Sequence, residues 1–354
     1  MYHREWYIRN VHNFFCLLMS DQIAITTRMI KNEAARLGFS ACGIARVEPV
    51  EAEMRRLDTW LAKGYQAGMA YLANHREIRR DPQGLVEGAK SIISVALNYY
   101  PARKRDPEQP HIAYYAYGRD YHEVVKEKLR QLWQYVLRNL PEGTAEEARV
   151  FTDSAPLLER YWAWKAGLGW IGKNTQLILP GKGSYFFLGE IVTTWKADAY
   201  DKPVPSRCGT CDRCLRACPT GALEKAHTLN ANHCLSYLTI ENRGEIPPRE
   251  ARLLGNRLYG CDTCQQVCPW NRFATPATEP DFQPSEALLQ LQKEDCRVIA
   301  SSHDFEKTEE KEALVQRFKR MDETGADILK IAVMPKNFED VAAIMQATKE
   351  MCTC

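Results

Sequence analysis

Apolar residues recur at intervals of three and four positions in two stretches of the first half of the chain. This spacing places them on one face of a helix. The first helix begins near Thr26 and ends at Gly38, because glycine is a common helix stop. A shorter helix over 58–64 also ends at a glycine. The two longer stripes are Met29, Ile30, Ala34 and Leu37, and Val125, Leu129, Leu132 and Val136.

Short runs of β-branched and aromatic residues separate these helices. The runs over 40–47 and 91–99 predict strands, and 183–194 predicts a strand or a hairpin. Asp153 stands at the end of a further predicted strand, where an aspartate can also cap the next helix. Strands that alternate with helices predict an α/β or α+β domain.

The pattern changes after residue 273. Residues 274–295 have the composition of a linker, and we place a domain boundary there. Beyond it, strands are expected at 297–301 and 328–334, and amphipathic helices at 309–321 and 338–351. This order predicts a βαβα unit over 296–354.

Two polar stretches within the first part allow both a structural and a functional interpretation. On composition alone, the basic group His75, Arg76, Arg79 and Arg80 is as consistent with a solvated loop as with a site. Four tyrosines between positions 114 and 121 suit a ligand wall, because an aromatic body with a polar tip serves that purpose. They suit packing equally well.

The length of 354 residues is sufficient for two or three domains, and 45% hydrophobic residues can form a sizeable core. The net charge of +2 gives no overall basic signature for nucleic acid. No run reaches the length of a transmembrane helix. Residues 1–19 lack a signal-peptide pattern, and we expect a disordered extension before a natural start at Met19. The cytoplasm is the default location.

Eight of the 13 cysteines lie between Cys208 and Cys268. The first four follow the spacing C-x2-C-x2-C-x3-C-P of bacterial iron–sulfur proteins, in which the cysteine before proline serves the other cluster. The second run has one cysteine fewer, and Cys234 replaces it. We therefore predict two [4Fe-4S] clusters in a ferredoxin-like domain. One is held by Cys208, Cys211, Cys214 and Cys268, and the other by Cys218, Cys234, Cys261 and Cys264.

Two other uses of these cysteines fit the spacing less well. Zinc binds pairs of the C-x2-C type, but it needs neither a third cysteine at the same spacing nor two Cys-Pro pairs. Disulfides need an oxidising compartment, which nothing in the chain suggests. The glycines at 167–172 do not follow a strand in the G-x-G-x-x-G pattern, so a dinucleotide fingerprint is rejected.

The residues over about 20–285 resemble epoxyqueuosine reductase. The resemblance rests on Asp120-Tyr121-His122, on the runs 152–159 and 167–173, on both Cys-Pro runs, and on the stretches 234–241 and 255–262. It implies a cytoplasmic reductase that uses cobalamin and two [4Fe-4S] clusters to convert epoxyqueuosine to queuosine at the tRNA wobble position. Residues 20–200 would then form the cobalamin-binding domain and 201–273 the cluster domain.

The same resemblance implies roles for single residues. Asp153 would be the proton donor, and its apolar neighbours predict a dry site that keeps it protonated. His122 is not assigned as a cobalt ligand, because a structural role at a helix start explains it equally well. The residues implied around the corrin are Arg79, Tyr121, Asp153, Lys173, Asn174, Leu177, Leu188, Ser236, Cys261 and Asp262.

The tail departs from that family and resembles type I 3-dehydroquinate dehydratase. The resemblance implies a Schiff-base lysine at Lys330 and an acid/base histidine at His303. That enzyme is an eight-stranded barrel of about 250 residues, and a βαβα piece cannot close one. We therefore expect a barrel fragment without dehydratase activity. Its nine basic and eleven acidic residues make it a poor substitute for a tRNA-binding tail.

The expected partners are tRNA and an external electron donor, with no membrane, and we expect a monomer. Two other functions remain open at this stage. One is another corrinoid iron–sulfur reductase, such as a reductive dehalogenase. The other is an electron carrier without a substrate site. Cobalt content separates the carrier from the enzymes, and activity on epoxyqueuosine tRNA separates the enzymes from each other.

Overall fold

The computed structural model describes residues 25–103, 110–284, 299–304, 308–323 and 328–351. The chain divides into two compact units, one extending to Ser285 and one covering 286–354. The predicted extension over 1–19 and the later part of the predicted linker lie outside the described residues. None of the described helices has the length and apolar character that crossing a bilayer requires.

The first unit is built on a four-stranded sheet in which every neighbouring pair is antiparallel. The sheet decides between the two predicted classes, because a wholly antiparallel sheet flanked by helices is an α+β arrangement. In spatial order its strands are β1 (Ala41–Arg46), β2 (Ser91–Asn98), β7 (Phe186–Thr193) and β4 (Ala148–Phe151).

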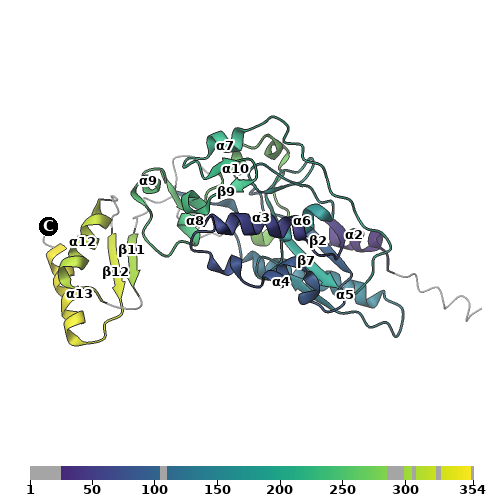
Figure 1. Ribbon diagram of the computed structural model, residues 1–354, viewed down its shortest axis with the longest axis horizontal. Helices are drawn as coiled ribbons and strands as arrows, with labels where there is room; N and C mark the ends of the chain where they lie inside the picture. Colours follow the sequence, from purple (N-terminus) through teal and green to yellow (C-terminus); the bar gives the residue numbers. More distant parts are fainter. Residues whose placement is uncertain (1–24, 104–109, 285–298, 305–307, 324–327, 352–354) are drawn as a thin grey trace, which may run out of the picture. The chain divides into compact units, whose positions relative to one another are not determined.

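Helices cover both faces of this sheet (Figure 1). One face packs against α2 (Thr27–Arg36) and α5 (Tyr121–Arg138). The predicted stripe on α5 is buried throughout, whereas on α2 only Ile30 and Ala34 of the predicted stripe are buried, beside Thr27 and Glu33. Gly189 permits the close approach of α5, since a Cβ there would lie 2.8 Å from Val125. The other face packs against α3 (Glu51–Ala62) and α6 (Glu159–Lys165).

One local prediction in this unit is corrected, and one open choice is refined. The helix expected at 58–64 is the end of α3, which begins seven residues earlier, at Glu51. The basic group, for which a solvated loop and a site were both open, lies in and just before α4 (Arg76–Arg80), between η1 (Ala70–Ala73) and η2 (Pro82–Gly84). His75 and Arg76 are exposed to solvent, and the Arg79 side chain is buried.

The cysteine-rich segment consists of short elements that belong to the same compact unit as the sheet. Its strand β10 (Arg257–Tyr259) pairs in parallel with β3 (His111–Ile112), which joins the domains predicted at 20–200 and 201–273. Its other elements are α7 (Arg213–Ala217), β8 (Leu223–Lys225), β9 (Thr228–Leu229), η4 (Ala231–His233), α8 (Leu235–Ile240), α9 (Pro248–Ala251), α10 (Thr263–Gln266) and η5 (Pro269–Phe273).

The start of the predicted linker is packed rather than free. Phe282, in η6 (Pro280–Phe282), is buried, and its ring centroid lies 4.8 Å from that of Phe187. A Cβ on Gly118 would lie 2.0 Å from the Asp281 carbonyl oxygen, so the glycine allows this backbone to approach. Composition predicted a linker because it cannot show that a single aromatic side chain, here Phe282, is buried. The compact unit therefore extends beyond residue 273.

The second unit has the predicted βαβα order. Its strands β11 (Ile299–Asp304) and β12 (Ile328–Val333) pair in parallel. Helices α12 (Lys311–Asp322) and α13 (Phe338–Met351) complete it, and α13 has the predicted bounds. Leu314, Val315, Phe318 and Ala347 form its small core.

Candidate active site and cluster cavities

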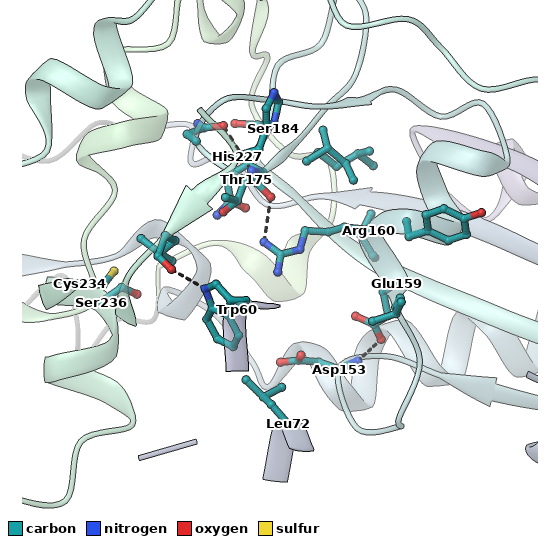
Figure 2. Close-up of a pocket in the computed structure, with 18 of the residues that line it drawn as sticks. Trp60, Leu72, Asp153, Glu159, Arg160, Thr175, Ser184, His227, Cys234 and Ser236 are labelled. Carbon is teal, nitrogen blue, oxygen red and sulfur yellow. Dashed lines mark hydrogen bonds between the residues drawn. The ribbon is translucent and has the colours of Figure 1, made fainter. Parts of the chain in front are cut away.

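A cleft of about 2150 Å³ opens within the first unit, between the sheet with its helices and the cysteine-rich segment. Ordinary small-molecule sites enclose about 300–1,000 Å³, so this cleft has space for a large cofactor. Asp153, Glu159 and Arg160 lie on one side of it, and Cys234 and Ser236 on the other (Figure 2). The predicted corrin residues that line it are Arg79, Tyr121, Asp153, Asn174, Leu177, Leu188, Ser236, Cys261 and Asp262.

Asp153 lies two residues after β4, in a left-handed backbone conformation with φ 52°. Such a conformation is uncommon for residues other than glycine and often accompanies a functional constraint. The Asp153 amide donates a hydrogen bond to Glu159 Oε1. Asp153 does not cap α6, because the N-cap is Leu158, which makes no side-chain cap bond.

The Asp153 carboxylate meets two side chains from the start of α5. Tyr121 Oη donates a hydrogen bond to Asp153 Oδ2 at 2.5 Å, and His122 Nε2 lies 3.9 Å from the same oxygen. Burial, together with the charge of Asp153, raises the pKa of Tyr121, so its hydroxyl stays a donor. The Tyr121 ring is stacked on Phe187, with centroids 4.2 Å apart, which fixes the direction of this hydroxyl.

The dry site predicted for Asp153 is not found, since its side chain is 65% exposed to the cleft. A nearby carboxyl group is present instead. Burial, with the charge of Asp153 as the next cause, raises the pKa of Glu159 to about 8. The sequence reasoning missed Glu159 and also Glu190, which is fully buried in β7. The available signal for Glu190 is that it is the lone acidic residue inside the apolar run 186–192.

Two arginines bring positive charge to the cleft. Arg79 donates from Nε to the Asn74 carbonyl at 3.1 Å, and burial lowers its pKa. Arg160 Nη1 donates to the Thr175 carbonyl at 2.8 Å (Figure 2). Crowding by protein atoms also lowers the pKa of Arg160, which the sequence reasoning did not single out.

The tyrosines divide between the two roles considered for them. Tyr114 and Tyr117 are buried, and their ring centroids lie 5.3 Å apart. Tyr115 and Tyr121 instead line the cleft. His122 stands in the first turn of α5, where its amide and its Nδ1 both bond Asp120 Oδ1. These bonds give His122 a structural role.

The eight cysteines fall into two groups with the predicted membership. A cavity of about 210 Å³ is lined by the first group, together with Trp270 and Phe273. The second group lines the large cleft. Within the described ranges, no three His, Cys, Asp or Glu side chains converge as on a single metal ion. The first group is Cys208, Cys211, Cys214 and Cys268, and the second is Cys218, Cys234, Cys261 and Cys264.

The thiols within each group affect one another. Burial is the largest cause of the raised pKa of Cys264, and the charges of Cys234, Cys261 and Cys218 add to it. Burial likewise raises the pKa of Cys214, with Cys268 as the next cause. Gathered thiolates of this kind are stabilised by bound iron, because the metal supplies the opposing positive charge. Both cysteine groups therefore fit an iron–sulfur cluster.

Lys173 and Asn174 make contacts that differ from those the resemblance implied. They lie in the turn between β5 (Trp170–Ile171) and β6 (Leu177–Ile178). Lys173 Nζ donates to the carbonyls of Gly209 and Cys211, at 2.7 and 2.8 Å, and lines the small cavity instead of the cleft. Asn174 Nδ2 donates to the Cys264 carbonyl at 3.2 Å. The turn thus holds both cysteine loops.

The remaining predicted residues form parts of the cleft wall. Leu177 and Leu188 belong to β6 and β7, and Ser236 belongs to α8. Asp262 is buried and accepts a hydrogen bond from the Tyr114 amide at 2.9 Å. Its carboxylate therefore anchors the tyrosine segment at the edge of the cleft.

In the second unit, His303 and Lys330 lie on the paired strands β11 and β12. Lys330 stands opposite Ser301, and His303 stands opposite Ala332. Lys330 is exposed. A dehydratase site needs the enclosing strands of a barrel, and the described residues of this unit supply a two-stranded sheet.

Three family models match the chain. Residues 79–154 match a model described as Epoxyqueuosine reductase QueG, DUF1730. Residues 207–271 match a 4Fe-4S double cluster binding domain, and residues 278–353 match type I 3-dehydroquinase. The last match covers the second unit, so the predicted change of family along the chain is confirmed.

Curated relatives cover most of the first unit. An epoxyqueuosine reductase of Cellulophaga algicola is 43% identical, over 81% of this chain and 92% of the relative. One from Cyclobacterium marinum is 47% identical, over 74% and 84% of the two chains. One from Escherichia coli is 41% identical, over 73% and 69%.

Solved structures agree with these relatives. An epoxyqueuosine reductase in complex with an epoxyqueuosine-modified tRNA-Tyr stem loop superposes with a TM-score of 0.67 at 33% identity, over 73% of this chain and 68% of that chain. The Bacillus subtilis enzyme, solved with an aspartate catalytic loop swung out of its active site, has a TM-score of 0.64 at 33% identity over the same shares.

Proposed function

The chain belongs to the epoxyqueuosine reductases, and on that premise we propose that its cleft binds a corrin cofactor and the modified base of tRNA, with Asp153 as the proton donor. The reaction is the reduction of epoxyqueuosine to queuosine in tRNA, and the protein uses two [4Fe-4S] clusters. One observation carries the proposal for the site. Asp153 and the second cysteine group line one cleft.

The cleft fits a corrin in both size and lining. Its volume of about 2150 Å³ exceeds that of an ordinary ligand site. Leu177 and Leu188 offer apolar surface to a macrocycle, and Arg79 and Ser236 offer polar contacts at its edge. Cys208, Cys211, Cys214 and Cys268 would hold one cluster, and Cys218, Cys234, Cys261 and Cys264 the other.

Removing the epoxide oxygen as water consumes two electrons and two protons. When bound, the clusters supply single electrons and the corrin supplies a reactive reduced metal centre. The protein's part is to position the base and deliver protons. The Asp153 carboxyl gives one of these protons to the oxygen as the carbon–oxygen bond breaks, and solvent in the open cleft supplies the second. Tyr121 Oη then stabilises the carboxylate that remains, through the hydrogen bond it already makes.

The direct test is turnover of epoxyqueuosine-containing tRNA by the full chain, purified anaerobically, reduced and supplied with cobalamin. We expect about eight irons per chain, bound cobalt, and queuosine detected by nucleoside mass spectrometry. The same protein without cobalamin is the control. Equal turnover with and without cobalamin would contradict the proposal that the cleft uses a corrin. Zinc in place of iron would reject the clusters.

The same experiment separates the alternatives. A halogenated small molecule turned over in preference to tRNA would favour a dehalogenase, and absent cobalt with intact clusters would favour an electron carrier. We further propose an external electron donor, a monomer and a cytoplasmic location, which suit an enzyme that modifies tRNA. Light scattering and fractionation test the last two.

A further inference from the structure

Glu190 is an ionisable side chain in an apolar layer. It lies in the central strand β7, opposite Ser94 of β2 and Phe151 of β4. Side chains two positions apart share a face of a strand, so Glu190 points with Val192 toward the layer that contains Trp162 of α6. Its exposure is 0%, and no donor group bonds its carboxylate oxygens among the residues that the structure describes. The side chain placed to share a hydrogen with it is the carboxyl group of Glu159.

A carboxylate in such a place is costly unless it is neutral or paired. Ser94 Oγ and Trp162 Nε1, on the same face, are also buried without partners among the described residues. Burial raises the pKa of Glu190 well above its usual value, and the charge of Glu159 is the next cause. Two neighbouring carboxyl groups, one of them sealed in an apolar layer, favour one negative charge over two.

Glu159 connects this buried acid to the cleft. It begins α6, which packs on β7, and its Oε1 accepts the hydrogen bond from the Asp153 amide (Figure 2). That bond holds Asp153 at its positive φ, from which the carboxylate reaches Tyr121. The position of the proton donor therefore depends on where the Glu159 carboxyl lies.

Other charged groups also act on this pair. Asp153 faces it from the loop after β4, Arg160 from α6, and Lys126 and Tyr121 from α5. The positive charges of Arg160 and Lys126 favour ionisation of Glu159, whereas Asp153 opposes it. No charged group faces Glu190 from its cross-strand neighbours Ser94 and Phe151.

We propose that Glu159 and Glu190 share one proton, and that this proton keeps Glu159 in place as the acceptor for the Asp153 amide. Glu159 and Glu190 are thus positioning residues for the proton donor, an inference that rests on the proposed role of Asp153. Loss of the shared proton leaves two neighbouring carboxylates, one of them fully buried, that repel each other. Glu159 then moves away, and the Asp153 loop loses its anchor.

The test compares wild type with Glu190→Gln, which keeps the shape of the side chain but cannot ionise. Wild-type single-turnover rates on epoxyqueuosine tRNA should fall at alkaline pH as the pair loses its proton. In Glu190→Gln this alkaline fall should disappear, because an ionised Glu159 without a charged neighbour still accepts the Asp153 amide. Glu159→Ala removes the acceptor and should lower the rate at least tenfold at every pH, a loss of about 1.4 kcal/mol or more in transition-state stabilisation.

Two readouts do not need turnover. Infrared spectra of protein with ¹³C-labelled glutamate should show a protonated carboxylic acid at neutral pH, lost at alkaline pH in wild type and absent in Glu190→Gln. Melting temperatures give the second. A carboxyl group whose pKa is higher in the folded protein than in the unfolded chain stabilises the fold. This stabilisation is complete below the unfolded-state pKa of about 4.5, and it is lost as the pH rises through the folded-state pKa. Glu190→Gln should therefore melt increasingly above wild type as pH rises toward 8 to 9.

Glu127→Gln, on the exposed side of α5, is the matched control and should behave as wild type in all three measurements. If Glu190→Gln does not fold, Glu159→Gln takes its place, because its carboxamide oxygen can still accept the amide. An alkaline fall that persists in either variant, or an acid band that persists in Glu190→Gln, would overturn the inference; the band is not a readout for Glu159→Gln, in which burial alone keeps Glu190 protonated. If the enzyme fails to turn over, the infrared band and melting curves still decide whether the pair shares a proton.

Discussion

Asp153 shows how the surroundings of one residue define its role. Its backbone has positive φ, its amide is bonded to Glu159, and its carboxylate is bonded to Tyr121. Each contact comes from a different part of the chain, and together they aim an exposed carboxyl group into the cleft. A residue with a purely structural role would not need this exposure, since capping carboxylates point back to the backbone.

Asp153→Asn is expected to lower turnover of epoxyqueuosine tRNA by at least about 100-fold, because positioned acids contribute about 10²- to 10⁴-fold. The amide keeps the shape of the side chain but gives up no proton. Iron and cobalamin content should stay at wild-type levels, as measured by metal analysis and absorbance. Asp322→Asn, exposed in the second unit, is the control. Turnover at the wild-type rate would remove Asp153 from the mechanism.

At the scale of elements, the turn between β5 and β6 links the sheet unit to both cysteine loops. Lys173 is bonded to the loop of the first group, and Asn174 to the loop of the second. The turn is tightly built, since a Cβ on Gly172 would lie 2.7 Å from Asn174 Oδ1. These bonds hold backbone carbonyls next to cluster ligands, where small shifts change how well the ligands are oriented.

Lys173→Ala is expected to destabilise the cluster held by the first cysteine group and to spare the other. The Gly209 and Cys211 carbonyls lose their donor, so iron should fall from about eight toward about four per chain on dilution or mild chelation. Iron analysis with electron paramagnetic resonance measures both the amount and the cluster type. Lys196→Ala, an exposed change outside both cavities, is the matched control. Equal iron retention in both variants would show that the Lys173 bonds do not matter.

At the scale of the whole molecule, the chain joins two units of different family. The first contains the sheet, the cleft and both cysteine groups, and it extends through the packed Phe282 to Ser285. The second has a small core and a two-stranded parallel sheet within its described residues. An eight-stranded barrel is required to surround a Schiff-base lysine, so the second unit lacks most of the dehydratase scaffold.

We expect that 3-dehydroquinate with borohydride will trap no covalent adduct at Lys330 of the full chain. A complete type I dehydratase, treated in parallel, supplies the positive control. Mass spectrometry of the intact protein and of its peptides detects an adduct directly. An adduct that disappears in Lys330→Ala would show that the second unit forms a working site, alone or in an assembly of several copies.

The sequence by itself determined the cysteine grouping, the helical stripe on α5 and the βαβα order, because all three are set by spacing along the chain. Three cysteines at intervals of three residues are brought to one cavity by local geometry, whatever surrounds them. Likewise, the stripe on α5 needs nothing beyond 3.6 residues per turn.

Only the tertiary structure decided the rest, because it depends on contacts between residues far apart in sequence. Lys173 reaches Cys211 across 38 positions, and composition cannot show that contact. The exposure of Asp153, the burial of Arg79 and the packing of Phe282 depend equally on what lies against each side chain. The sequence shows that position 190 is a glutamate. Its raised pKa follows only from the apolar layer that surrounds it in the folded protein.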